Sequence, residues 1–254
     1  MDKPESDPLS APCSRRRLMR LAARLGGAVA LGRAGLAAAT TAPPRETGLS
    51  FEGLLKREPG FQPRRPAPMP YASLPGFLSA RQIAQAYSAY RRAFADLIEA
   101  ERRLASAARD AAHAAQYAAL RARQMRAANA VLLHEFFFRN LAPEPVAPSP
   151  YVMANLHEHM GSFASWREDF AACARVAGAW AVLAYDPYDD RWHNTPLGAD
   201  DAGGWTGANP LVVIAVAAET WSLDYPDRDR WTAAAIEHID WNAVAARYHA
   251  VDRQ

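Results

Sequence analysis

The chain has 254 residues, half of them hydrophobic, so it can bury a core and form one or two domains. Seven of its 29 basic residues but only three of its 27 acidic residues fall within residues 1–39, so the formal charge of +2 becomes about −2 for the remainder. This balance excludes a broadly basic surface, and no nucleic-acid partner is expected.

Residues 1–39 resemble a twin-arginine export signal. The paired Arg15 and Arg16 precede a weakly apolar run rich in Gly and Ala, which ends near Ala39 in small residues that fit a cleavage site. A basic, unstructured N-terminus is the alternative, but it leaves the small-residue end of the run unexplained. Two further arginines interrupt the run, which disfavours a membrane anchor. The mature protein is therefore expected to be periplasmic or secreted, without a membrane anchor, and to keep Cys173 but no intrachain disulfide.

Two segments follow the signal. Residues 40–70 are rich in Pro and are predicted to form a linker or an extension along the surface. Residues 71–145 are predicted to form a helical hairpin domain, since the stretch from Phe77 to Ala142 has neither Gly nor Pro. One helix of this length would extend about 99 Å at 1.5 Å per residue, so we place a turn near residues 105–113.

Residues 146–254 are predicted to form a C-terminal domain of mixed α and β structure. The pattern indicates a helix at 161–178, strands near 179–187 and 209–216, and a closing helix at 229–251. The expected fold class is therefore α+β, with an N-terminal helical hairpin followed by a mixed α/β domain that contains a small antiparallel sheet.

Six blocks of the chain resemble, in the same order, the iron/manganese superoxide dismutase family, and they span roughly residues 69–250. HEFFFRNLAP at 134–143 is similar to the family's H-x-F-Y-W-N-x-L block, and MGSFASWREDF at 160–170 is similar to its F-G-S-F-x-x-F-K helix. The resemblance implies the two-part fold of that family. For an active member it also implies disproportionation of superoxide by iron or manganese, held by three histidines, one aspartate and a solvent molecule. The other blocks are MPYASLPGFLSARQI, GAWAVLAYD, NPLVVIAVAAETWSLDYPDR and IEHIDWNAVAARY.

Carried over residue by residue, the resemblance leaves one of the four family ligands in place. The second histidine falls on His134, whereas the first falls on Ala86, the aspartate on Ala215 and the third histidine on Glu219. A slip of the alignment would not restore a ligand, because no histidine lies near any of the three changed positions in the sequence. High-affinity iron or manganese binding is therefore not expected here, and no cofactor is predicted unless the site has been rewired.

The residues that the resemblance places around the metal are changed as well. A histidine outside the ligand set falls on Tyr90, the gateway tyrosine on Phe94, and the group that hydrogen-bonds the metal-bound solvent on Ala130. Helical spacing puts Ala86, Tyr90 and Phe94 on one helix face, and Ala130 and His134 on one face of another helix. We expect these faces to converge on a site filled by methyl groups and aromatic rings.

Three interpretations of His134 remain open. A buried, hydrogen-bonded ion pair with Glu219 could replace the metal, since a lone buried carboxylate is costly. His134 could instead be a core histidine bonded to a backbone group, or one ligand of a rewired metal site. A rewired site would need further donors, for which His157 and His159, on either side of Glu158, are the candidates; an exposed polar turn at the start of a helix is the alternative for them.

Other aromatic residues of the C-terminal half indicate packing. Trp180, Trp221 and Trp241 are predicted to lie in the core because each belongs to an apolar segment. Trp205 lies in GGWTG, which lacks the lysine and the strand-to-helix context of a phosphate-binding loop, and is predicted to be exposed. His193 is predicted to be a structural residue of a strand or turn.

Assembly is left open by the resemblance. Family members form homodimers through a glutamate and histidine pair that reaches the partner's metal site. Here Ala218 and Glu219 occupy those positions, and Ser222 replaces the usual tyrosine. A homodimer of the family type is therefore possible, but its bridging residues are absent.

The expected function is that of an exported superoxide dismutase-family protein that has lost the metal site and acts as a non-catalytic binding or structural protein. One alternative is an active superoxide dismutase with a rewired iron or manganese site that includes His134 and Glu219. A second alternative is an extracytoplasmic module that binds a small molecule in the vacated cavity, with Ala86, Tyr90, Phe94 and Ala130 as its lining. The identity of the ligand or protein partner does not follow from the sequence.

Overall fold

The computed structural model describes residues 65–198 and 204–252. The predicted export signal and most of the Pro-rich segment lie outside these ranges. The end of that segment does lie along the first helix, because the Ala67 N–H donates a 2.8 Å hydrogen bond to the Tyr90 hydroxyl and the Ala67 carbonyl accepts one from Tyr87.

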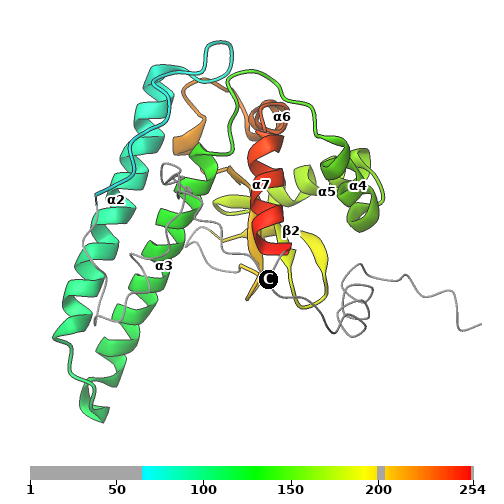
Figure 1. Cartoon of the computed structure of the whole chain (residues 1–254). Coiled ribbons are helices and arrows are strands. Elements are labelled where there is room, and N and C mark those ends of the chain that lie inside the picture. Colours follow the sequence, from blue (N-terminus) through cyan, green and yellow to red (C-terminus); the bar gives the residue numbers. More distant parts are fainter. Residues whose placement is uncertain (1–64, 199–203, 253–254) are drawn as a thin grey trace, which may run out of the picture. The chain divides into compact units, whose positions relative to one another are not determined.

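Two long helices form the predicted N-terminal hairpin. Helix α2 (Ala80–Ala105) and helix α3 (Ala114–Phe138) run side by side and are joined by a turn that contains the short helix η2 (Ala111–His113) (Figure 1). Ser79 caps α2 by accepting a hydrogen bond from the Gln82 N–H, which satisfies one of the free donors of the first turn. The turn lies within the predicted range.

Within the described residues, the second half contains four helices, the short helix η3 and one sheet. The helices are α4 (Pro150–Met160), α5 (Phe163–Val176), η3 (Ala218–Thr220), α6 (Arg228–Glu237) and α7 (Trp241–Asp252). Strands β1 (Trp180–Asp186), β2 (Arg191–Leu197) and β3 (Asn209–Ala215) form an antiparallel sheet in the order β2-β1-β3. The predicted α+β fold class, with a helical hairpin and a small antiparallel sheet, is confirmed.

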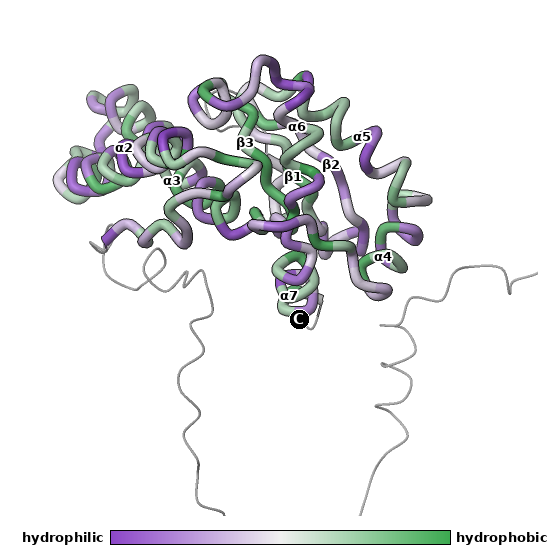
Figure 2. The backbone as a smooth tube through the Cα atoms, turned by 90° about the horizontal axis from the view of Figure 1, so that it is seen from above, coloured by the Kyte–Doolittle hydropathy of each residue, from purple (hydrophilic) through white to green (hydrophobic). Residues whose placement is uncertain are grey.

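The central strand β1 carries the core. All seven of its residues are buried, and its first residue, Trp180, pairs with Leu197 on one side and with Ala215 on the other. Helix α5 packs on β1 and β2, while α3 and α7 contact β3. Figure 2 shows apolar residues gathered along β1 and β3, between the helices. The sheet therefore brings Ala215, at the end of β3, next to the start of β1.

Two expectations about elements need correction, on α4 and on the closing helix. Helix α4 was not expected, although Ser149 caps it and Pro150 opens it, a common helix start. The segment around His193, expected to be a strand or a turn, is the edge strand β2. The closing helix is two helices, because Asp240 accepts hydrogen bonds from the Asn242 and Ala243 N–H groups and starts α7 separately.

The predictions for the tryptophans agree with the structure, except that Trp221 is only partly buried. Trp180 and Trp241 are buried, Trp221 is partly buried against the core, and Trp205 is 47% exposed. None of the described helices is both long enough and apolar enough to cross a bilayer.

Candidate functional site

His134 lies on α3 in an apolar environment with 5% of its surface exposed. Its Nδ1 is 2.7 Å from the Ala130 carbonyl oxygen, which can only accept, so Nδ1 carries the proton. Burial lowers the pKa of His134 to about 4, and the ring is therefore neutral at pH 7. Its Nε2 is then a hydrogen-bond acceptor, and it has no partner within the described part of the chain.

Aromatic rings surround His134 on the core side. The Trp180 ring meets it edge to face at 4.8 Å between centroids, and the Tyr90 and Phe138 rings lie at 6.1 and 5.9 Å. The Tyr90 hydroxyl donates a 2.7 Å hydrogen bond to Glu135 Oε1, so its proton is not available to the imidazole nitrogens. The Trp180 and Phe138 rings fill space and offer no ligand for a metal.

The positions that the resemblance aligns with two of the family's metal ligands are closed. Ala86 and Ala215 are 3% and 0% exposed, and Phe94 is 2% exposed. Methyl groups and a benzene ring offer no lone pair. The expectation that methyl groups and rings fill this region agrees with the structure.

No hydrogen bond joins Glu219 to His134 in the described structure, so the hypothesis of a buried His134–Glu219 pair is wrong. The Glu219 carbonyl accepts hydrogen bonds from the side-chain amides of Gln82 at 2.8 Å and Gln85 at 2.9 Å, which hold η3 against α2. Its carboxylate lies 3.2 Å from Arg92, and 48% of the Glu219 side chain is exposed. A hydrated carboxylate with an exposed arginine avoids the desolvation that a buried pair would require.

A cavity of about 430 Å³ lies between α2 and α3, with His134 and Glu219 both in its lining. Two ion pairs cross it, Arg92 with Glu219 and Arg123 with Asp96 at 2.8 Å. The expected lining is only partly right. Ala130 lines the cavity, but Ala86, Tyr90 and Phe94 lie in the core behind it. The complete lining is Ala89, Arg92, Ala93, Asp96, Arg123, Arg126, Ala127, Ala130, His134 and Glu219.

The residues proposed as donors for a rewired site do not join His134. His157 and His159 lie in the last turn of α4, not at the start of a helix as expected. The His159 ring stacks on Trp192 with 5.5 Å between centroids, and burial lowers its pKa. In the described ranges, neither His134 nor Glu219 belongs to a group of three side chains that could hold a metal ion.

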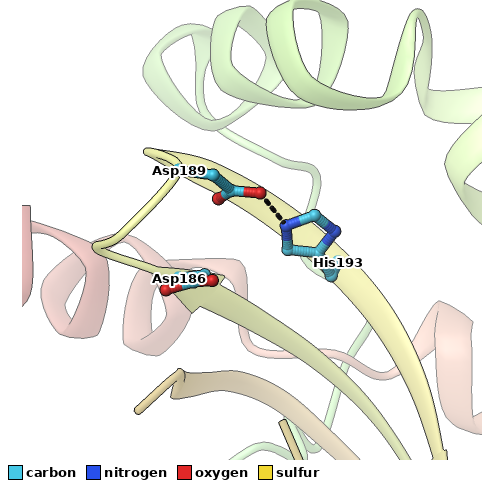
Figure 3. Close-up of side chains that lie close together, drawn as sticks. All are labelled: Asp186, Asp189 and His193. Atoms are coloured by element: carbon cyan, nitrogen blue, oxygen red, sulfur yellow. Dashed lines mark hydrogen bonds and ion pairs between the residues drawn. The ribbon is translucent and has the colours of Figure 1, made fainter. Parts of the chain in front are cut away.

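One group of three such side chains does occur in the described part of the chain, at the β1–β2 turn, and the sequence reasoning missed it. Asp186, Asp189 and His193 place one donor atom each within 4.8 Å of one another (Figure 3). The signal was present in the spacing of DPYDDRWH, but only the fold of the hairpin brings these residues together.

The same three residues already have partners that organise the turn. Asp186 accepts hydrogen bonds from the Tyr188 N–H and from Trp205 Nε1, and Asp189 Oδ2 lies 2.8 Å from His193 Nε2. The His193 ring stacks on Trp205 at 4.1 Å. These contacts agree with the structural role expected for His193.

Comparison with known proteins points to one family. Residues 148–247 match the family described as iron/manganese superoxide dismutases, C-terminal domain. The manganese superoxide dismutase of Haloarcula marismortui is 26% identical over 185 residues, which cover 72% of this chain and 91% of that protein. Superoxide dismutase [Mn] 2 of Haloferax volcanii is 33% identical over 119 residues, 46% of this chain. An iron superoxide dismutase of Aquifex aeolicus is 29% identical over 120 residues.

The matches do not cover every relative equally. The chain spans 60% of the length of the Haloferax protein and 56% of the Aquifex protein. The family match covers residues 148–247, and the helical hairpin that precedes these residues has the arrangement that the resemblance implies. Together they show that this chain is similar to iron/manganese superoxide dismutases, most directly over residues 148–247.

Proposed function

We propose that this chain is a non-catalytic member of its family, exported by the twin-arginine route, which uses the dismutase scaffold to bind another molecule. One observation carries the proposal. His134 keeps a family ligand position, but buried alanines stand at two of the others and Glu219 turns outward to Arg92.

The iron or manganese of the family does not fit this set of residues. A five-coordinate ion needs three further protein donors near His134 Nε2, and the described residues supply none in a group with it. The loss of a single outer hydrogen-bond partner typically costs about 10 to 100-fold in metal affinity. The loss of three direct ligands is far more severe.

The relatives' names favour a second candidate, an active superoxide dismutase. That activity would require iron or manganese at a rewired site that includes His134. The two candidates differ in metal content, which can be measured directly.

The test is metal analysis of full-length protein purified without chelators, together with a superoxide assay. We expect far less than one iron or manganese per chain and no activity above that of buffer. About one iron or manganese per chain, with activity that a His134→Phe substitution abolishes, would contradict the proposal.

A restored variant provides the positive control. Substitution of Ala86→His, Ala215→Asp and Glu219→His together rebuilds the family donor set around His134. We expect this triple variant to take up iron or manganese, since it restores the three histidines and one aspartate at the positions that the resemblance assigns to them. The single variant Ala86→His is the matched control and should not bind either metal tightly.

Export is a separate part of the proposal. It predicts that a reporter fused after residue 39 reaches the periplasm, and that Arg15→Lys with Arg16→Lys retains it in the cytoplasm. A fusion that is exported equally well with both arginines replaced would contradict this route.

A further inference from the structure

His134 lies in the lining of the cavity, and its buried Nε2 has no hydrogen-bond partner in the described structure. The Nδ1–H donates to Ala130, so Nε2 of the neutral ring presents a lone pair, and no described group donates to it. A buried acceptor without a partner destabilises the protein. A ligand that places a donor at Nε2 would remove this destabilisation.

The burial of His134 decides which kind of hydrogen-bond donor can bind to its Nε2. His134 is 5% exposed and its nearest rings are apolar. An ammonium group brought to this depth would lose its hydration without a carboxylate to pair with, because the Glu219 carboxylate already pairs with Arg92. A neutral hydroxyl avoids that penalty and still donates one hydrogen bond.

The lining has a net positive charge. It contains Arg92, Arg123 and Arg126 against Asp96 and Glu219. The first two arginines pair with the two acids, whereas Arg126 forms no ion pair with any residue in the described ranges. Arg126 is therefore available to a carboxylate, with which a guanidinium can form two parallel hydrogen bonds.

The side chains that line the cavity between His134 and the arginines are small and apolar. Four alanines on α2 and α3 contribute methyl groups, and the volume of about 430 Å³ lies in the range of small-molecule sites. The methyl walls suit the short carbon chain of a compact acid. The list of these alanines is Ala89, Ala93, Ala127 and Ala130.

We propose that this cavity binds a small hydroxycarboxylate, whose hydroxyl donates to His134 Nε2 and whose carboxylate pairs with Arg126. The inference rests on the proposed function, because a metal on Nε2 would occupy the same lone pair. It names the chemical class of ligand that the non-catalytic scaffold would hold.

The experiment compares matched acids by titration calorimetry at pH 7 on the full-length chain. The pairs are lactate against propionate and malate against succinate, which differ by one hydroxyl. We expect at least one hydroxy acid to bind about 10-fold more tightly than its partner, the effect of one hydrogen bond to a buried acceptor.

Two variants assign the contacts. His134→Phe should keep weak binding but remove the preference for the hydroxy acid. Arg126→Gln should weaken both acids of a pair about 10-fold and keep the preference. Arg91→Gln, an exposed arginine on α2 outside the lining, is the matched control and should change neither value.

Three outcomes would overturn the inference: no binding of any of the four acids at millimolar concentration, equal affinities within both pairs, or a preference that survives in His134→Phe. If His134→Phe fails to fold, the preference of the unsubstituted protein for the hydroxy acids and the affinities of Arg126→Gln still test the inference. Failure here with a metal-free protein would leave the proposed function intact, whereas iron or manganese on the purified chain would remove both.

Discussion

His134 and Glu219 both line the cavity between α2 and α3, but their surroundings differ. His134 lies among rings with one hydrogen bond to its own helix, and Glu219 lies on η3 with its carboxylate in contact with solvent and Arg92. Desolvation explains both placements, since a neutral imidazole tolerates burial and a carboxylate does not. The two side chains are therefore independent of each other.

Burial of a neutral His134 makes stability depend on pH. The pKa falls from about 6.5 in the unfolded chain to about 4 in the native protein. As the pH drops below 6.5, the unfolded chain takes up a proton that the native ring does not, so the free energy of unfolding decreases until about pH 4. By pH 5 the loss is about 2 kcal/mol.

The free energy of unfolding is measured by denaturant titration between pH 7.5 and 4.5, for the unsubstituted protein and for His134→Phe. We expect the curve of the variant to lack this loss, so that the difference between the two proteins changes by about 2 kcal/mol between pH 7 and pH 5. Parallel curves would show that His134 is not buried in neutral form.

The sequence predicted which residue types lie around His134 better than it predicted where the Glu219 side chain lies. The alanines at 86 and 215 were visible in the sequence, and both are buried as expected. The direction of Glu219 was not predictable, because it depends on Gln82 and Gln85, more than 130 residues away in the chain. Contacts of that range are set by the fold.

Helix boundaries in the second half depend on single capping residues. Ser149, Ser162 and Asp227 each accept a hydrogen bond from a first-turn N–H of α4, α5 and α6. Gly161 ends α4 with a φ of 81°, a value that favours glycine. The sequence pattern predicted α5 but missed α4 and joined α6 to α7, because such capping contacts depend on single polar residues.

Asp240 is the clearest example, because a periodic sequence suggested one helix where two exist. The residue accepts hydrogen bonds from Asn242 at 3.0 Å and Ala243 at 3.1 Å, and its own N–H donates to the Asn140 carbonyl. These contacts break the chain between α6 and α7. The hairpin α2–α3 was easier to predict, since its composition left only the turn to place.

We expect Asp240→Ala to lower the free energy of unfolding by about 1 kcal/mol through loss of the α7 cap. Asp240→Asn is the matched control, because its side-chain oxygen can still accept both hydrogen bonds, and it should cost much less. Thermal or urea unfolding followed by circular dichroism measures both. Equal losses in the two variants would assign the effect to charge instead of capping.

The two halves of the described chain are joined where α3 ends. Residues 140–142 lie against residues 238–240 through an Ala142 N–H bond to the His238 carbonyl and the Asp240 N–H bond to Asn140, both 2.7 Å. Leu141 and Ile239 form an isolated β-bridge at the same place. The helical hairpin that carries His134 is therefore fixed to the α6–α7 corner.

Arg247 completes this junction from α7. Its guanidinium donates to the Leu211 carbonyl of β3 at 2.7 Å, to the Asn140 side chain, and to the Phe136 and Arg139 carbonyls at the end of α3. Burial lowers its pKa to about 10, which still leaves it charged at pH 7. One cation therefore links α3, β3 and α7, and only the folded chain reveals this role for an arginine in an ordinary helical sequence.

Arg247→Met keeps most of the side-chain volume but removes every donor, so the acceptors on α3 and β3 are left buried without a partner. We expect the free energy of unfolding to fall by about 3–5 kcal/mol, because each buried carbonyl left without a donor costs about 1–3 kcal/mol. Arg102→Met is the matched control: its exposed pair with Glu99 should contribute less than about 1 kcal/mol.

Because Arg247 joins the sheet to the helix of His134, hydrogen exchange in the last turn of α3 should also increase in Arg247→Met and stay unchanged in Arg102→Met. A loss of stability no larger than that of the control would show that the junction holds without this arginine.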